Sequence, residues 1–296
     1  MATERTSWEF EEGDEIAPGR TVLKPIGGGS AYEVLLVWDD RLFSIMVAKV
    51  VRPDQLEDAG TMRGLRREAD ALRTLAHPCL IRGFDAVLDP PYPHVLIEHL
   101  EGPTLRRLIK RHGPLPHEQL LPLALHVASV LHYLAEEEIV HLDVKPDNIV
   151  MGVPPRLIDL SVARPFERAR RIEGAIGTDP YMAPEQCGTP EYRAGIGATT
   201  DVWGLGATLF HAVTGHVPFA RHGDERFPQL SDDPQPLPGD VPEALRELLL
   251  AMLRKNPAER PSAKEAGLAL EPLVASMPRL VRLGRGGAKR RPSAPI

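Results

Sequence analysis

The chain has 296 residues, of which 43% are hydrophobic and 26% charged, so it can bury a full core and disorder cannot dominate it. The net charge of −6 argues against a general nucleic-acid binder, and the two cysteines, Cys79 and Cys187, cannot build a disulfide framework or a four-cysteine zinc site. No apolar run reaches about eighteen residues, and the N-terminal sequence is acidic where a signal peptide is positively charged. We therefore expect a cytoplasmic protein without a membrane span.

The N-terminal part of the chain predicts a small β-rich lobe. Residues 18–51 alternate apolar side chains around a glycine cluster, which indicates strand, tight loop, strand, turn and strand. Residues 62–76 predict one helix, because apolar residues recur there at three- and four-residue spacing: Leu65, Ala69, Leu72 and Leu75. Two more strand-like runs follow, and the Gly102-Pro103 pair then marks a linker.

Beyond this linker the sequence is mostly helical. Helices are expected at 105–111, 117–137, 200–214, 242–254 and 263–275. Prolines break the pattern between residues 219 and 242, so this stretch is expected to be an ordered loop. The last residues are basic and carry no acid, which predicts a disordered tail.

A glycine-rich turn at 27–29 lies between two predicted strands, where backbone N–H groups can approach phosphates. Lys49 follows in a strand-like run whose apolar neighbours do not suit an unpaired ammonium, and Glu68 on the predicted helix is a candidate partner. The two side chains could together anchor the α- and β-phosphates of a nucleotide. Taken alone, a hairpin loop, a snorkelling lysine and a surface glutamate are the more ordinary interpretations.

The segment HLDVKPDNIV, residues 141–150, crowds an aspartate, a lysine and an asparagine into a stretch that proline keeps from being helical. Asn148 and Asp159 supply two oxygen ligands suited to Mg²⁺, which is completed by waters and phosphate oxygens. Asp143 would accept the proton of an attacking hydroxyl, and Lys145 would offset charge on the transferring phosphoryl group. A solvated β-turn remains the alternative for this loop considered by itself.

The order of these motifs resembles the eukaryotic-type Ser/Thr protein kinase family over residues 18–272. GGGSAYEV resembles its glycine-rich loop, VAK its strand lysine motif, HLDVKPDN its catalytic loop, DLS its metal-binding triplet and GTDPYMAPE the end of its activation segment. The resemblance implies an α+β, bilobal protein-kinase-like fold. Its N-lobe would span 18–101 and its C-lobe 102–272, between an acidic segment at 1–17 and the basic tail at 273–296. Arginine-rich, lysine-poor usage is similar to that of bacterial, especially actinobacterial, members.

The resemblance also implies an activity and a set of site residues. The chain would transfer the γ-phosphoryl group of ATP to protein Ser or Thr hydroxyls, with Mg²⁺ or alternatively Mn²⁺, and protein substrates would be its partners. The implied catalytic residues are Asp143, Lys145, Lys49, Glu68 and Thr178, and the implied metal ligands are Asn148 and Asp159. The implied nucleotide contacts are Ile26, Gly27, Gly28, Gly29, Val34, Ala48, Lys49, Ile97, Glu98, Leu100 and Val150. Glu185 with Arg260, and Asp201 below the catalytic loop, would be structural.

Three positions depart from the family pattern without removing a chemical group. Tyr32 replaces the third glycine of the loop, Leu142 replaces the arginine before the catalytic aspartate, and Leu160-Ser161 replace Phe-Gly. In kinases switched by loop phosphorylation the added phosphate pairs with that arginine, and leucine offers neither charge nor donor. We therefore predict that activity does not require phosphorylation of the activation loop.

Two other functions stay open at this point. The altered DLS and glycine-loop motifs are compatible with a pseudokinase, a nucleotide-binding regulator of a partner. A small-molecule phosphotransferase of the same fold shares the nucleotide lobe, but GTDPYMAPE favours a protein acceptor. The proline-broken stretch at 219–242 leaves the docking of a substrate in doubt.

Overall fold

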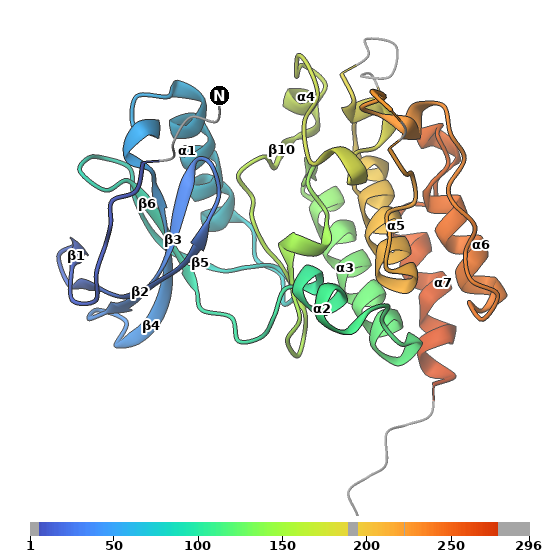
Figure 1. Cartoon of the computed structure of the whole chain (residues 1–296), viewed down its shortest axis with the longest axis horizontal. Helices are drawn as coiled ribbons and strands as arrows, with labels where there is room; N and C mark the ends of the chain where they lie inside the picture. The colour runs from blue at the N-terminus through green and yellow to red at the C-terminus, as the bar shows by residue number, and fades with distance from the viewer. Residues whose placement is uncertain (1–5, 189–194, 222, 278–296) are drawn as a thin grey trace, which may run out of the picture.

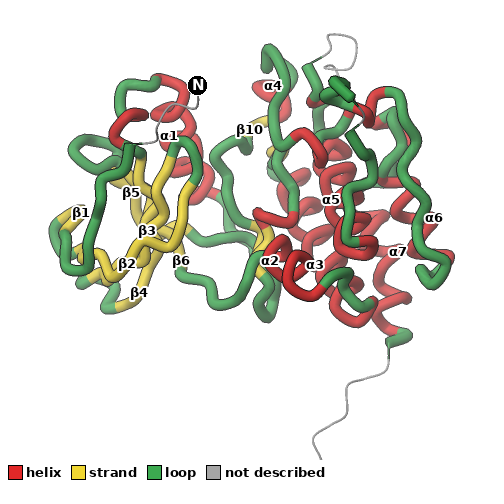
Figure 2. The backbone as a smooth tube through the Cα atoms, in the orientation of Figure 1, coloured by secondary structure: helices red, strands yellow, loops and turns green. Residues whose placement is uncertain are grey.

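A six-stranded antiparallel sheet forms the N-terminal lobe of the computed structural model, which describes residues 6–188, 195–221 and 223–277. Figure 2 shows the long strands gathered in this lobe together with helix α1, and the other long helices in the second lobe, which confirms the predicted bilobal α+β fold. In sheet order the strands are β1 (Glu15–Ala17), β2 (Arg20–Gly28), β3 (Tyr32–Asp39), β4 (Ser44–Val51), β6 (His94–Glu98) and β5 (Gly83–Val87).

Strand β3 buries alternate residues, as expected for a sheet with two different faces, whereas the central strand β4 is mostly buried on both faces. On one face, Leu35 and Val37 pack with residues of β4 and β6 in an apolar cluster that also includes Phe10. On the other face, Val51 belongs to the core shared with the helices, and Lys49 reaches that side as well. The sheet therefore separates a closed apolar side from the side that meets helix α1.

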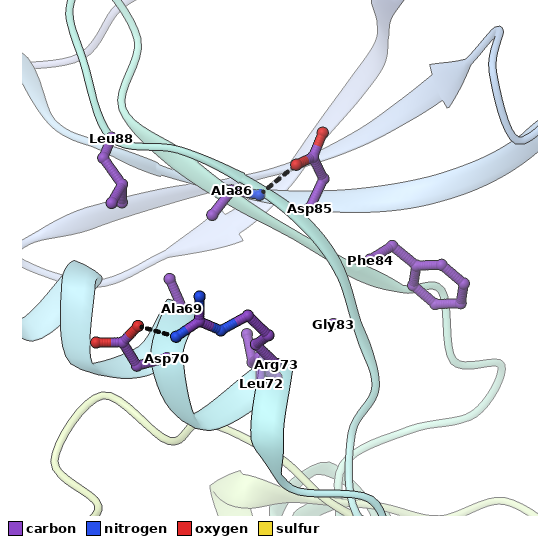
Figure 3. A pocket seen from close by; sticks show the side chains of 9 residues that line it. All are labelled: Ala69, Asp70, Leu72, Arg73, Gly83, Phe84, Asp85, Ala86 and Leu88. Atoms are coloured by element: carbon purple, nitrogen blue, oxygen red, sulfur yellow. Dashed lines mark hydrogen bonds and ion pairs between the residues drawn. The ribbon is translucent and has the colours of Figure 1, made fainter.

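Helix α1 (Ala59–Thr74) is the one helix expected in this lobe (Figure 1). Asp58 caps its N-terminus, because the carboxylate accepts a hydrogen bond from Thr61 N at 2.6 Å. The helix buries Leu65, Glu68 and Leu72, spaced so that they share one face. A groove of about 460 Å³ lies between this helix and strand β5 (Figure 3).

The C-terminal lobe is helical, as predicted. Its main helices are α2 (Leu105–His112), α3 (His117–Glu136), α5 (Ala198–Thr214), α6 (Glu243–Met252) and α7 (Ala263–Ala275). Helix α5 is buried along nearly its whole length, so it lies at the centre of this lobe (Figure 1). In the described part of residues 219–242 the chain forms no α-helix but a single 3₁₀ turn, Pro228–Leu230, which agrees with the expected loop.

Short elements that the sequence did not predict shape the region between the lobes. Two-stranded pairs join β7 (Ile139–Val140) to β10 (Arg164–Pro165) and β8 (Ile149–Val150) to β9 (Arg156–Leu157), and helix α4 (Phe166–Ala169) follows β10. These pairs fix both ends of the catalytic loop and the start of the activation segment.

Two of the predicted segments lie at the ends of the chain. The acidic segment set apart at 1–17 includes Trp8 and Phe10, whose rings lie 4.8 and 5.1 Å from the ring of Tyr92, so the described part of it packs on the N-lobe sheet. The basic tail predicted for 273–296 begins within α7, and its residues 278–296 lie outside the described residues. The domain boundaries themselves stay a prediction.

Candidate functional site

Lys49 joins the two lobes through one ammonium group. Its Nζ lies 2.8 Å from Glu68 Oε2 on α1 and 2.8 Å from Asp159 Oδ1, which follows strand β9. Burial alone would lower the pKa of Lys49, but the two carboxylates raise it above its usual value. Burial would likewise raise the pKa of Asp159, but Lys49 holds it well below its usual range. Burial raises the pKa of Glu68, and Lys49 opposes that rise. The predicted Lys49–Glu68 pair is therefore present in the fold.

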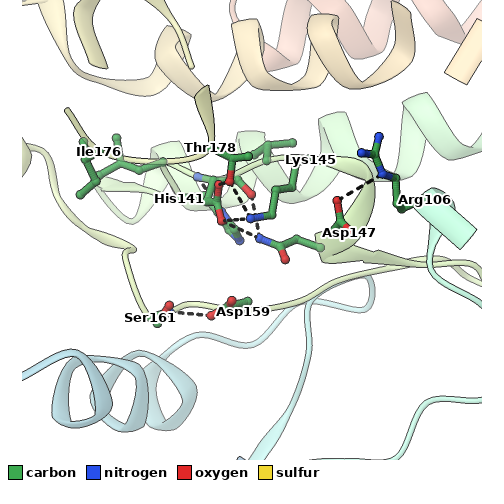
Figure 4. A network of polar contacts seen from close by, with 12 residues as sticks. Arg106, His141, Lys145, Asp147, Asp159, Ser161, Ile176 and Thr178 are labelled. Carbon is green, nitrogen blue, oxygen red and sulfur yellow. Dashed lines mark hydrogen bonds and ion pairs between the residues drawn. The ribbon is translucent and has the colours of Figure 1, made fainter. Parts of the chain in front are cut away.

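A second network includes Asp143 of the catalytic loop, and its members Lys145 and Thr178 are labelled in Figure 4. Thr178 donates its hydroxyl to Asp143 Oδ1 at 2.7 Å, and Lys145 Nζ lies 2.7 Å from Asp143 Oδ2 and 2.6 Å from Thr178 Oγ1. Asn148 Nδ2 donates to Asp143 Oδ2 at 3.0 Å. The carboxylate is thus held in one orientation by a hydroxyl, an ammonium and an amide.

Helix α5 supports this loop from below. Asp201 is buried, and its two carboxylate oxygens accept hydrogen bonds from His141 N at 2.6 Å and Leu142 N at 2.8 Å. Leu142 has φ 69° and Asp159 has φ 68°, a left-handed conformation that costs free energy for residues other than glycine. Strained backbone of this kind persists where the surrounding contacts fix it. Here it occurs at Leu142, beside Asp143, and at Asp159, a predicted metal ligand.

The donor set fits a hard divalent cation. Asn148 uses its amide nitrogen on Asp143, which leaves the carbonyl oxygen as a ligand, and Asp159 uses Oδ1 on Lys49, which leaves Oδ2. In the described ranges no group of three or more His, Cys, Asp or Glu side chains is placed to hold a metal ion. Two protein oxygens completed by water and phosphate are the arrangement typical of Mg²⁺.

Strand geometry corrects one predicted nucleotide contact. Val34 stands opposite Lys49, and Ile97 stands opposite Val47, so these four share one face of the sheet. Ala48 points to the other face, where it is fully buried against Leu35 and Leu96, and it cannot touch a nucleotide. The prediction for Ala48 is therefore wrong, and Val47 is the neighbouring β4 residue that shares a face with Lys49 and Val34.

The glycine-rich loop keeps its backbone open. A Cβ built on Gly27 or Gly29 would meet nothing within 4 Å, so a phosphate can approach both. Gly28 has φ 149°, and a Cβ there would lie 2.5 Å from Tyr32 O, so only glycine fits this turn. Arg52 Nε donates to Gly29 O at 2.8 Å, and the same guanidinium donates from Nη1 to Thr6 O, which links the N-terminal segment to the loop.

Tyr32 has a role that the sequence did not reveal. Its hydroxyl donates to Thr61 O on α1 at 3.2 Å, and Lys49 Nζ lies 4.6 Å from the centre of its ring. Burial raises the pKa of Tyr32 to about 12. A Cβ on Gly64 would lie 3.2 Å from the tyrosine oxygen, so a small residue at 64 makes room for this contact. The substitution of the third glycine thus connects the loop to α1.

The remaining residues predicted to contact a nucleotide lie at the end of β2 and around the linker between the lobes. Ile26 is 46% exposed at the end of β2, Val150 lies on β8, and Leu100 follows β6. Glu98 turns its side chain to Arg82 N at 2.9 Å, so only its backbone is left for a ligand. Gly102 has φ 127°, and a Cβ there would lie 2.3 Å from the carbonyl oxygen of Met151, which explains the glycine at the linker.

An apolar cluster holds the activation segment against the catalytic loop. Leu142 is 2% exposed and packs with Val140, Ala169 and Ile196. Gln186 adds polar contacts that the sequence did not indicate, because its Nε2 donates to Leu142 O and to Ile176 O, both at 2.8 Å. At position 142, where the family carries an arginine, Leu142 therefore makes apolar contacts in place of charged ones.

Residues 177–181, with the sequence GTDPY, are held by side chains from the proline-broken loop at 219–242. Arg226 Nε lies 2.8 Å from Asp179 Oδ2, and Gln229 Nε2 donates to Asp179 O at 2.9 Å and to Met182 O at 3.2 Å. Tyr181 donates to or accepts from His211 Nδ1 on α5 at 2.7 Å. Although its described residues form no α-helix, this loop fixes the segment that follows Thr178.

Comparisons with known proteins show which family this chain resembles. A family model described as "Protein kinase domain" matches residues 20–268. The chain is 33% identical over 256 residues to the probable serine/threonine-protein kinase PkwA of Thermomonospora curvata, covering 84% of this chain and 33% of that protein. It is 30% identical over 252 residues to the serine/threonine-protein kinase PknB of Mycobacterium leprae, covering 79% and 39% respectively. The chain thus spans less than half the length of these relatives. Within the described residues, no helix is long and apolar enough to cross a membrane.

Proposed function

This chain belongs to the protein kinase family, and on that premise we propose that it transfers the γ-phosphoryl group of ATP to Ser and Thr hydroxyls of proteins. The observation that carries the proposal is the simultaneous contact of Lys49 with Glu68 and Asp159, beside an Asp143 held by Thr178. Both networks are assembled at once, as phosphoryl transfer by positioning and electrostatics requires.

In the proposed reaction the acceptor hydroxyl lies against Asp143. As the new P–O bond forms and the bond to the β-phosphate breaks, Asp143 takes the hydroxyl proton and ADP leaves. Thr178 and Lys145 orient the carboxylate, and Lys145 also faces the transferring group. Lys49, held by Glu68, would position the α- and β-phosphates. Mg²⁺, or alternatively Mn²⁺, held by Asn148 and Asp159, would neutralise charge on the phosphates.

A protein acceptor is supported by the segment after Thr178. Asp179 and Tyr181 lie in a 3₁₀ turn and are fixed by Arg226 and His211, so an ordered surface segment follows Thr178 beside Asp143. Such a surface suits a peptide, whereas a small acceptor needs an enclosed pocket. The names of the relatives support Ser and Thr as the acceptor residues.

The class of acceptor can be tested directly. Purified chain is incubated with γ-labelled ATP, Mg²⁺ and either a generic basic protein, an aminoglycoside or choline. We expect label on protein, and acid hydrolysis should return it as phosphoserine or phosphothreonine. Label on the aminoglycoside or on choline, with none on protein, would instead identify a small-molecule phosphotransferase.

We propose further that the activation segment needs no phosphate. Its hydroxyls between Leu160 and Pro184 are Ser161, Thr178 and Tyr181. Thr178 is bonded to Asp143, and Tyr181 is buried against His211. The Leu142 cluster and Gln186 already join the segment to the catalytic loop.

The expected result is that phosphatase-treated enzyme keeps its initial rate, measured before it can rephosphorylate itself. The phosphatase is removed before ATP is added, and mock-treated enzyme is the control. A tenfold or larger drop, about 1.4 kcal/mol in the barrier, that preincubation with ATP restores would show that a phosphosite orders the segment.

A further inference from the structure

A cluster of arginines lies between α1 and the start of the activation segment, apart from the catalytic residues. A cavity of about 450 Å³ is lined there by Arg63, Arg66 and Arg67 of α1, Arg164 of β10 and Arg168 of α4. The one acidic residue in its wall is Asp70, which pairs with Arg73 at 3.1 Å. The cavity therefore collects positive charge in a chain whose net charge is −6.

These guanidinium groups are not neutralised. Across residues 6–188, 195–221 and 223–277, no carboxylate lies within 4.0 Å of any of the five. Arg67 donates to the carbonyl oxygen of Ser161 at 3.1 Å, and Arg164 donates to that of Val162 at 2.9 Å. Burial and the neighbouring Arg67 lower the pKa of Arg164 to about 10, and burial with Arg63 and Arg168 lowers that of Arg67. Half-buried like charges of this kind favour an anion between them.

The activation segment of this chain offers no described hydroxyl whose phosphate would lie among these arginines. Thr178 and Tyr181 are engaged elsewhere, and the backbone oxygen of Ser161 already accepts from Arg67. A phosphate on Ser161 would also lie beside Asp159, whose Oδ1 accepts from Ser161 N. The described hydroxyls of the activation segment therefore do not supply the anion.

We propose that this arginine cluster binds a phosphorylated peptide segment of a partner protein, with the phosphoryl group between Arg67 and Arg164. Planar guanidinium groups bind phosphoryl oxygens two at a time, and Arg63 and Arg168 at the rim extend the positive surface for the flanking peptide. A long nucleic acid suits the place less well, because it would be repelled by the acidic remainder of the chain.

The contacts of Arg67 connect the proposed phosphoryl site to the candidate catalytic residues. Arg67 precedes Glu68 on α1, and Arg67 also holds Ser161 O, two residues after Asp159. An anion at Arg67 and Arg164 ties α1 to the activation segment, and so favours the arrangement in which Lys49 contacts both carboxylates. This regulatory step rests on the proposed kinase function, whereas the binding does not.

Binding is tested by fluorescence anisotropy on the whole chain without ATP. The probe is a short labelled peptide with one phosphoserine and uncharged flanks, and the same peptide with serine is its control. We expect binding of the phosphopeptide to weaken tenfold or more in the double variant Arg63→Gln/Arg168→Gln, and also in Arg67→Gln. The matched double variant Arg107→Gln/Arg111→Gln removes two exposed arginines from α2 and should bind like the wild type.

Three further arms distinguish the sources of the anion and the consequence of binding. Inorganic phosphate and a short single-stranded oligonucleotide should compete only weakly, and the phosphopeptide should raise the initial rate about fivefold or more in wild type but not in Arg63→Gln/Arg168→Gln. Equal affinity in all variants, or stronger binding of phosphate or oligonucleotide than of the phosphopeptide, would overturn the site. Binding that depends on the arginines but leaves a measurable rate unchanged would overturn the coupling to Glu68.

Discussion

Replacing Asp143 with asparagine is expected to lower the rate of phosphoryl transfer by on the order of 10² or more, because the acceptor hydroxyl loses its proton acceptor. Asparagine keeps the shape of the side chain, and its carbonyl oxygen can still accept from Thr178, whereas its amide nitrogen cannot accept from Lys145. The change is confined to this one network, so the fold should be unaffected. The steady-state rate at saturating ATP, measured with thermal unfolding of the same samples, checks both parts.

Two further variants are compared with Asp143→Asn, one expected to lose activity and one expected to keep it. Lys49→Met removes the contact with Glu68 and Asp159 and should lower the rate by a similar factor, since positioning of the phosphates is lost. Asp147→Asn changes an aspartate of the same loop that is half exposed and 3.9 Å from Arg106, and its rate should stay near that of wild type. Near wild-type turnover in Asp143→Asn would remove Asp143 from the mechanism.

The second large effect is on stability. Arg260→Met is expected to lower the free energy of unfolding by about 3–5 kcal/mol, because it leaves the Glu185 carboxylate buried without its partner. The two side chains are fully buried, with Nη1–Oε1 at 2.6 Å and Nη2–Oε2 at 2.9 Å. The same guanidinium also donates to three backbone carbonyls and lies over the ring of Trp203. Urea unfolding of wild type and variant measures the difference.

The controls separate an unpaired charge from lost packing. The double variant Glu185→Leu/Arg260→Met should lose less stability than Arg260→Met alone, because no buried charge remains. Arg73→Met breaks the exposed pair with Asp70 and should change little. If Arg260→Met unfolded within about 1 kcal/mol of wild type, the pair would not have the structural role assigned to it.

Much of the fold, and the proximity of several candidate site residues, could be predicted from the sequence, because the relevant signals are local. Apolar spacing located α1 and the helices of the C-lobe, and proline located the loop after Phe219. The side chains of Asp143, Lys145 and Asn148 are close in the chain, so their shared network follows from one short loop.

What could not be predicted depends on contacts between distant segments. Gln186 meets Leu142 across 44 residues, and nothing in its sequence neighbourhood indicates that contact. In the sequence Tyr32 only marks the absence of the third glycine, whereas in the fold its hydroxyl donates to the carbonyl oxygen of Thr61. The error at Ala48 was avoidable, because strand alternation from Lys49 already places residue 47, not residue 48, on the same face of the sheet as Lys49.

The proposal that this chain is a working kinase, not a pseudokinase, is tested most directly by counting transferred phosphoryl groups. The chain is incubated with γ-labelled ATP, Mg²⁺ and an excess of a generic protein acceptor, and label on the acceptor is compared with the amount of enzyme. We expect many acid-stable phosphoryl groups per enzyme molecule, rising linearly with time and abolished by Asp143→Asn. ATP that binds, as shown by a shift in thermal unfolding, but passes no label to the acceptor or to the chain itself would contradict the proposal.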